Sequence, residues 1–178
     1  MSKLNEYSCI MLKCHNNALI KLMHDTFKRI PIQILAPGEN TDFNPHITIL
    51  YGIYTSNIQD ILNPLKNVSF VNYKTTGISA FTSNSEYDVL KIDVDSVDLL
   101  YLNKKCRHSL QHKEFYPHYK PHLTIAYIKK ENQSYIKELS KSDLFKNLYD
   151  ISHITNISTA DDKKFNFNLQ SKRLEQIK

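Results

Sequence analysis

The sequence predicts an α+β protein built from two similar halves, each a βαβ-type unit, with antiparallel sheets lining a central cleft. Strand-like and helix-like segments alternate along the chain, which is typical of a mixed architecture. The string Pro-His-x-Thr-Ile-x-Tyr occurs twice, starting at Pro45 and at Pro121, so an internal duplication is expected. A chain of 178 residues has the length of one domain, and we expect residues 1–178 to form it.

The composition is that of a soluble globular protein. Hydrophobic residues make up 41% and charged residues 23% of the chain, so a core can form without a disulfide or a metal. A formal net charge of +5 and a pI of about 9.0 suit an anionic ligand. The lysines are scattered along the sequence, so a groove for long nucleic acid is not expected.

The cysteines and the N-terminus indicate a cytoplasmic protein. Cys9, Cys14 and Cys106 lack CxxC spacing and are typical of reduced thiols. The N-terminus has no signal-peptide pattern, and the sequence has no apolar run of 18 residues. We therefore expect neither secretion nor a membrane partner.

In the first half, a strand, a helix, a loop and a second strand are expected in that order. Residues 7–14 are a short apolar run that predicts a buried strand. Residues 16–29 begin with an asparagine pair that can cap a helix, and they carry apolar residues at helical spacing. Residues 35–44 contain Pro, Gly, Asn and Asp and predict a loop. Residues 45–52 are β-branched with a proline at the start, where a strand tolerates it, and a short helix is expected near 57–66.

The second half repeats this order after a pair of alternating strands. The expected elements are strands at 68–81 and 86–94 joined by a turn at 82–85, a helix near 96–112, a polar aromatic loop at 112–120 and a strand at 121–129. A helix near 133–147 and two closing strands, about 149–158 and 163–170, complete the prediction.

The two repeated strings are the strongest functional signal in the sequence. Their histidines, His46 and His122, are 76 residues apart. Side chains on a strand alternate, so His46 and Thr48 share one face, as do His122 and Thr124. The same alternation predicts that Tyr51 and Tyr127 face the helical side and pack in the core. If a pseudo-twofold relates the halves, two imidazoles and two hydroxyls converge on one point.

These groups suit phosphodiester cleavage. A neutral imidazole can remove a proton from the attacking oxygen while an imidazolium protonates the leaving oxygen, and histidine holds either state near neutral pH. Thr48 and Thr124 can donate to the non-bridging phosphate oxygens. One His-x-Thr on a strand is usually only structural, but two with the same flanking residues favour catalysis. The sequence predicts a metal-independent phosphodiesterase with His46, Thr48, His122 and Thr124 as its catalytic residues.

Neighbouring residues are weaker candidates for binding the substrate. Asn44 and Lys120 lie two residues before the histidines, so alternation places them toward the mouth of the cleft. Lys120 can attract phosphate, although a solvated lysine is an equally good interpretation. Tyr116 and Tyr119 lie in the loop before the second motif and can stack on a base, as can Phe115.

Zinc is the alternative that the remaining histidines raise. His108, His112 and His118 approach the second motif along the chain, but they straddle a predicted helix and loop and have no cysteine partner in motif spacing. We therefore expect no metal and no other cofactor.

At PHITILYG and PHLTIAYI the sequence resembles the 2H phosphoesterase superfamily, whose two His-x-Thr/Ser motifs map onto His46, Thr48, His122 and Thr124. The resemblance implies a two-lobed fold and metal-independent hydrolysis of phosphodiesters. Within the superfamily, Leu50-Tyr51-Gly52, the short chain and the AT-rich coding bias look most like phage anti-CBASS nucleases. That likeness implies hydrolysis of 3′-5′ bonds in cyclic di- or trinucleotides in the host cytoplasm, counteracting antiviral signalling.

Other functions remain open on the sequence alone. The same superfamily implies 2′,3′-cyclic nucleotides or 2′,5′-oligoadenylate as alternative substrates, and a non-catalytic nucleotide sponge is a third hypothesis. Substrate choice is expected to reside in the loops at 35–44, 82–86 and 112–120, because loops on a rigid scaffold carry specificity. The partner is expected to be a small nucleotide, and the sequence does not decide the oligomeric state.

Overall fold

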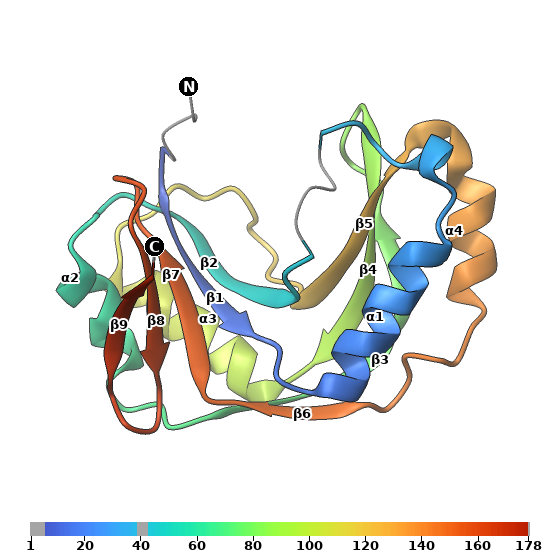
Figure 1. Ribbon diagram of the computed structural model, residues 1–178. Coiled ribbons are helices and arrows are strands. Elements are labelled where there is room, and N and C mark those ends of the chain that lie inside the picture. The colour runs from blue at the N-terminus through green and yellow to red at the C-terminus, as the bar shows by residue number, and fades with distance from the viewer. Residues whose placement is uncertain (1–5, 39–42, 178) are drawn as a thin grey trace.

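A computed structural model describes residues 6–38 and 43–177. The predicted domain 1–178 and the predicted loop 35–44 each include residues outside these ranges. Within them the chain forms two antiparallel sheets that stand side by side, with helices on their outer sides (Figure 1). The predicted α+β class with two antiparallel sheets is confirmed.

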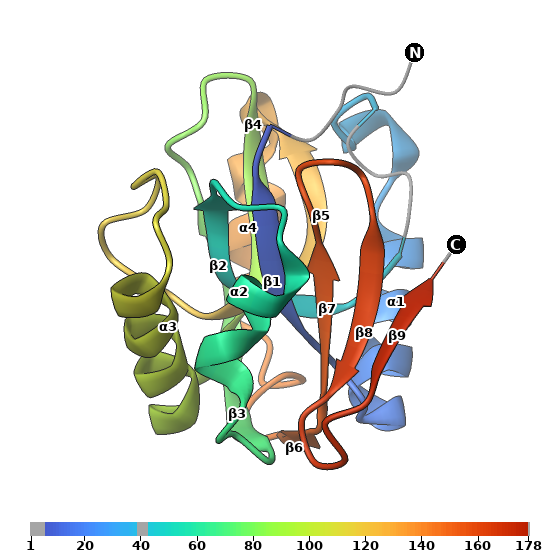
Figure 2. The ribbon, with the colours of Figure 1, turned by 90° about the vertical axis from the view of Figure 1, so that its left-hand side faces the viewer.

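The first sheet has five strands in the order β2-β1-β7-β8-β9, which Figure 2 shows from left to right. The strands are β1 (Ser8–Lys13), β2 (His46–Ile53), β7 (Ile154–Ser158), β8 (Lys164–Asn168) and β9 (Leu174–Ile177). The second sheet has four strands in the order β5-β4-β3-β6. They are β3 (Val71–Phe81), β4 (Tyr87–Asp95), β5 (His122–Lys129) and β6 (Tyr149–Ser152).

The helices begin at side-chain caps that the sequence provides. The α-helices are α1 (Asn17–Arg29), α2 (Ile58–Leu62), α3 (Val97–Ser109) and α4 (Gln133–Ser140), with short 3-10 turns η1 (Ile32–Ile34), η2 (Asn63–Leu65) and η3 (Lys130–Asn132). The Asn16 side chain accepts from the Leu19 amide at 3.0 Å and starts α1. The Ser96 hydroxyl accepts from the Leu99 amide at 3.0 Å and starts α3. Each bond satisfies an amide that has no partner inside its helix.

The two halves exchange their helices. Helix α1 follows β1 of the first sheet but packs against β5 of the second, while α3 follows β4 of the second sheet and packs against both β2 of the first sheet and β3 of the second. The two similar halves therefore interlock through their helices. The shared core contains Ile10, Leu12, Ile47, Leu90 and Leu123, all at most 1% exposed. Burial of apolar surface at this interlock holds β2 and β5 in place relative to each other.

Two predicted elements differ from the structure, and one strand was not predicted. The helix predicted at 133–147 ends at Ser140, and Phe145 instead packs into the core. The strand predicted at 149–158 is two strands: β6 belongs to the second sheet and β7 to the first. The buried positions change from even numbers in β6 to odd numbers in β7, and this change of parity marks the crossing between the sheets. Strand β9 was not predicted.

Candidate active site

The histidines of the two motifs are the first residues of β2 and β5. These two strands contact each other and diverge from their shared starting point (Figure 1). His46, Thr48, His122 and Thr124 are all partly exposed, whereas the residues between them are buried. The predicted alternation therefore holds through both motifs. We call the face of β2 and β5 that carries these four residues the motif face.

Both imidazoles are oriented by the same backbone interaction. His46 Nδ1 lies 2.7 Å from the Asn44 carbonyl oxygen, and His122 Nδ1 lies 2.7 Å from the Lys120 carbonyl oxygen. A carbonyl only accepts, so each Nδ1 carries the proton and donates it. Each Nε2 is then the ring atom available to a substrate as a base when neutral and as an acid when protonated. The geometry prepares both histidines for proton transfer.

Asn44 and Lys120 thus contribute their backbone carbonyls to the site. Both side chains are exposed. The equivalence of the two halves extends one residue further. The Pro45 carbonyl accepts from the Cys14 amide and the Pro121 carbonyl accepts from the Val94 amide, each at 3.2 Å.

A β-bulge follows each motif and overturns one prediction. In β2, Thr48 and Leu50 face consecutive residues of β1, so Ile49 is the extra residue. In β5, Thr124 and Ala126 likewise face consecutive residues of β4. The bulge reverses the alternation, and Tyr51 is 38% exposed instead of packing in the core as expected. Tyr127 follows the same rule and is partly exposed.

The bulge in β2 is held by a side chain of α3. Asn103 is buried and donates from Nδ2 to the Ile49 carbonyl at 2.6 Å. This bond satisfies a carbonyl at the irregular position of the ladder. The helix that packs on the first sheet therefore also fixes the backbone immediately after the first motif.

A buried lysine lies near His122, with a phenylalanine ring between them, and this arrangement was not predicted from the sequence. The Phe81 ring meets the His122 ring edge-on at 4.8 Å, and Lys91 Nζ lies 4.4 Å from the centre of the Phe81 ring. Lys91 is only 4% exposed, pairs with Asp93 and donates to the Ser79 hydroxyl at 2.6 Å. Alternation in 86–94 could have shown that Lys91 and Asp93 share one face of their strand. The pairing of β4 with β5 then places them opposite Thr124 and His122.

These surroundings lower the pKa of His122 below its ordinary value. Burial is the largest cause, and the positive charges of Lys91 and His46 act in the same direction. The Lys120 carbonyl and Asp93 oppose the shift. The neutral form of His122 is therefore favoured near neutral pH. The first half differs, since Lys13 and Met11 of β1 are the neighbours of His46 and Thr48.

The loop at 112–120 is attached to the end of β2. The Lys113 amide donates to the Gly52 carbonyl at 2.9 Å, and the Tyr119 hydroxyl donates to the Thr48 carbonyl at 3.0 Å. Gly52 has φ +91°, and a Cβ there would lie 2.7 Å from the Lys113 carbonyl oxygen. Only glycine permits this approach. Tyr119 is partly buried with its hydroxyl bonded to the strand, while Tyr116 is 68% exposed.

Other chemistry-bearing residues do not join the site. In the described ranges, no group of three or more His, Cys, Asp or Glu side chains is arranged to hold a metal ion. Burial raises the pKa of the Cys9 and Cys106 thiols to about 12, so both are protonated at neutral pH. Among the described residues, no helix is long and apolar enough to cross a membrane.

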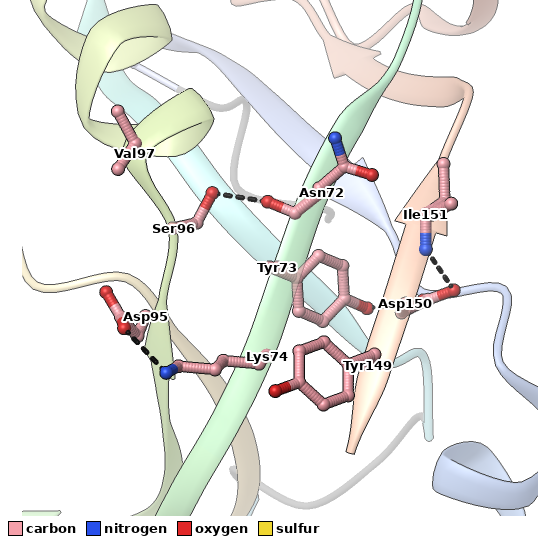
Figure 3. Close-up of a pocket in the computed structure, with 9 residues that line it drawn as sticks. All are labelled: Asn72, Tyr73, Lys74, Asp95, Ser96, Val97, Tyr149, Asp150 and Ile151. Atoms are coloured by element: carbon pink, nitrogen blue, oxygen red, sulfur yellow. Dashed lines mark hydrogen bonds and ion pairs between the residues drawn. The ribbon is translucent and has the colours of Figure 1, made fainter. Parts of the chain in front are cut away.

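A separate cavity of about 340 Å³ lies between β3, β6 and the start of α3 (Figure 3). None of the four motif residues lines it. Beside it the buried Asp150 accepts from the Tyr73 hydroxyl at 2.6 Å and from the amides of His15 and Asn16. These bonds show that Asp150 joins the two sheets, which is a structural role.

Comparison with known proteins gives the fold. The sequence matches no protein-family model and no curated protein sequence. Solved structures do match: Usb1 of Kluyveromyces marxianus with uridine monophosphate has a TM-score of 0.59 at 9% identity, covering 93% of this chain and 100% of that one. TT0787 of Thermus thermophilus has a TM-score of 0.60 at 8% identity, covering 96% of this chain and 95% of that one. E. coli LigT complexed with 3′-AMP has a TM-score of 0.57 at 12% identity, covering 99% of this chain and 96% of that one. The chain therefore has the 2H phosphoesterase fold that its two motifs led us to expect.

Proposed function

We propose that this protein is a phosphodiesterase that works by acid–base catalysis, with His46 and His122 as the proton-transferring groups. The observation that carries the proposal is the shared orientation of the two rings, each donating from Nδ1 to a carbonyl at 2.7 Å. Thr48 and Thr124 lie beside them on the motif face and are assigned to the non-bridging phosphate oxygens, where charge grows in the transition state.

The reaction that fits these groups has two balanced steps. A neutral histidine takes the proton of a ribose 2′-OH, whose oxygen attacks the adjacent phosphorus, while the other histidine, as imidazolium, protonates the departing 5′ oxygen. The 2′,3′-cyclic phosphate formed is then opened by water with the two roles reversed. Proton transfer, charge stabilisation and the leaving group are all served by side chains already present, so the reaction needs no metal.

The proposed substrate is a cyclic oligonucleotide second messenger, which would make the protein an inhibitor of antiviral signalling in the host cytoplasm. This finer assignment rests on the resemblance of Leu50-Tyr51-Gly52 to phage anti-CBASS nucleases. The net charge of +5 is compatible with any anionic nucleotide. Usb1 with uridine monophosphate and LigT with 3′-AMP or NADP+ are structures of this fold with small nucleotides. Tyr116 and Tyr119, with Asn44 and Lys120, remain the proposed substrate-binding residues.

The test is cleavage of three substrates by the purified protein in EDTA. They are 3′,3′-cyclic GMP-AMP, 2′,5′-triadenylate and 2′,3′-cyclic AMP, with products separated by chromatography. Opening of the cyclic dinucleotide, lost in His46→Ala and His122→Ala but retained in His108→Ala, is the expected result. His108 is an exposed histidine on α3 and serves as the matched control.

Each other outcome has a defined meaning. Cleavage of only one of the other two substrates keeps the mechanism and replaces the substrate. Tight binding of a nucleotide without any product supports the sponge hypothesis and contradicts catalysis.

A further inference from the structure

Each catalytic motif is followed, at the same interval, by a tyrosine that its bulge turns onto the motif face. Thr48 precedes Tyr51 and Thr124 precedes Tyr127 by three residues. The extra residue in each strand is an isoleucine, and the two residues before each tyrosine are both buried. Without the bulge both tyrosines would face the core. Two independent strands therefore place an aromatic ring on the same side as the catalytic groups.

The first ring belongs to a fixed aromatic surface, which we call the first platform (Tyr51 and Phe115). Their ring centres are 5.3 Å apart, and each ring is 38% exposed. Tyr7 is buried and packs edge-on against both rings, at 6.0 Å from Tyr51 and 5.4 Å from Phe115. The approach of Phe115 and Lys113 to Gly52 holds the loop in position, so the first platform is formed before any ligand arrives.

A cation lies beside the first platform. Lys113 Nζ is 4.9 Å from the centre of the Phe115 ring and 3.4 Å from the Tyr7 hydroxyl, and its side chain is exposed. An ammonium at the edge of an aromatic surface suits a ligand that carries both a planar aromatic ring and an anionic group. A nucleotide has that character.

The second ring has its own aromatic neighbour, which gives the second platform (Tyr127 and Tyr87). The ring centres are 5.2 Å apart with the planes at 85°, and both residues are partly exposed. The chain after α1 supports this strand as the loop at 112–120 supports β2, because the Ala36 amide donates to the Tyr127 carbonyl at 2.9 Å. The two halves thus repeat the motif, the bulge, the tyrosine and the supporting segment.

The two platforms belong to different strands, each beyond the motif of its own strand. Strands β2 and β5 begin together at the histidines and run apart (Figure 1), so their later residues are carried in different directions. At about 3.3 Å per residue, each tyrosine is roughly 10 Å along its strand from the threonine that precedes it. A phosphate held between the histidines would lie where the two strands begin, with one platform further along each strand.

We propose that the two platforms each stack one nucleobase, so that the preferred substrates are phosphodiesters joining two nucleosides. A 2′,3′-cyclic mononucleotide has only one base and would leave one platform empty. This inference rests on the proposed function for the position of the phosphate, and it deepens that function by excluding single-nucleoside substrates as the preferred class. It applies to a cyclic dinucleotide and to a linear dinucleotide alike.

The test uses a dinucleotide that binds but is not cleaved. The probe is ApA with a 2′-O-methyl group on its first ribose, which removes the attacking hydroxyl, and 3′-AMP is the probe with one base. Calorimetry of Tyr51→Leu and Tyr127→Leu is expected to show roughly fivefold to tenfold weaker binding of the dinucleotide in each variant, toward the low end of the loss found when one stacking ring is removed. Only one of the two changes should weaken 3′-AMP. Tyr101→Leu, which removes an exposed tyrosine of α3, should alter neither affinity.

A second measurement needs no variant and so does not depend on how the variants fold. Proton NMR of the dinucleotide with the wild-type protein should show upfield shifts for the base protons of both adenosines. Shifts confined to one adenosine, or equal affinities of the wild-type protein for the dinucleotide and 3′-AMP, would overturn the two-platform inference. Cleavage of unmodified ApA is assayed separately. A protein that stacks both bases and cleaves nothing refutes the proposed catalysis while leaving the two platforms in place.

Discussion

At the scale of single residues, the two motif histidines share an orientation but not an environment. Both Nδ1 atoms donate to the carbonyl of the residue two positions earlier. Only His122, however, rests against a phenylalanine whose ring covers a buried lysine. Such a difference favours one placement of a single shared proton over the other, which biases the two histidines toward different roles in the first step.

Burial is the largest cause of the lowered pKa of His122, and Lys91 is expected to add to it. Replacing Lys91 by Met removes a positive charge that disfavours the imidazolium, so the pKa of His122 should rise toward its ordinary value. Replacing Asp93 by Asn removes the opposing negative charge, so the same pKa should fall further. The measurement is an NMR titration of the histidine C2 protons. A Lys91→Met protein in which the His122 pKa falls or stays the same would contradict this assignment.

At the scale of elements, the decisive feature is the bulge that ends each motif. It combines a buried pair of apolar residues with a tyrosine that is exposed in β2 and partly exposed in β5, and a bulge of this kind bends its strand locally. The end of β2 depends in addition on Gly52, whose conformation and close contacts leave no room for a side chain.

Gly52→Ala is expected to lower the free energy of unfolding by about 3 kcal/mol, at the upper end of the cost of strained backbone. The added Cβ meets a backbone oxygen at 2.7 Å in a residue with φ +91°. Gly38→Ala is the matched control, because Gly38 also has positive φ (+76°) but has nothing within 4 Å of the added atom. It should cost about 1 kcal/mol, the penalty of the left-handed conformation alone. Denaturant unfolding measures both, and equal losses would show that the contact with Lys113 does not matter.

Asn103→Leu is expected to destabilise the protein by about 2 kcal/mol, since the Ile49 carbonyl would lose its buried donor. The loss should be accompanied by a fall in activity, because the same carbonyl lies directly after Thr48. Thermal unfolding and the cleavage rate check the two effects. A variant that unfolds at a lower temperature but cleaves at the normal rate would show that the bulge does not affect the proposed catalytic geometry.

At the scale of the whole molecule, the site depends on how two sheets are held together. The exchanged helices α1 and α3 supply one connection. Asp150 supplies another, since this buried carboxylate of β6 accepts from Tyr73 of β3 and from two amides at the start of α1. Strands β6 and β7 then carry the chain from one sheet into the other.

Asp150→Ala is expected to lower the free energy of unfolding by about 3 kcal/mol or more, because several buried donors lose one acceptor. Asp143→Ala, which removes an exposed ion pair with Lys146, should change it by less than about 0.5 kcal/mol. Denaturant unfolding compares the two. Similar losses would mean that Asp150 does not join the sheets as described.

The sequence was most informative where its pattern repeats. The two motif strands, the helices at 16–29 and 96–112 and the two-sheet architecture follow from periodicity, capping and the duplicated string. The bulges could not be predicted, because Ile49 and Ile125 read as ordinary members of an alternating strand and only pairing with β1 and β4 reveals an extra residue. The support from Lys91 was missed for the same reason, since it depends on which residues face each other across strands.

The central claim is that His46 and His122 act as one catalytic pair. The most direct measurement is kcat/KM for cleavage of the best substrate in EDTA, by the wild-type protein, both single alanine variants and the double variant. Groups that act together are not additive, so each single change should lower the rate by roughly 10²- to 10⁴-fold and the double change should lower it little further. A single variant that retains the wild-type rate, or a double loss equal to the product of the two single losses, would contradict the account.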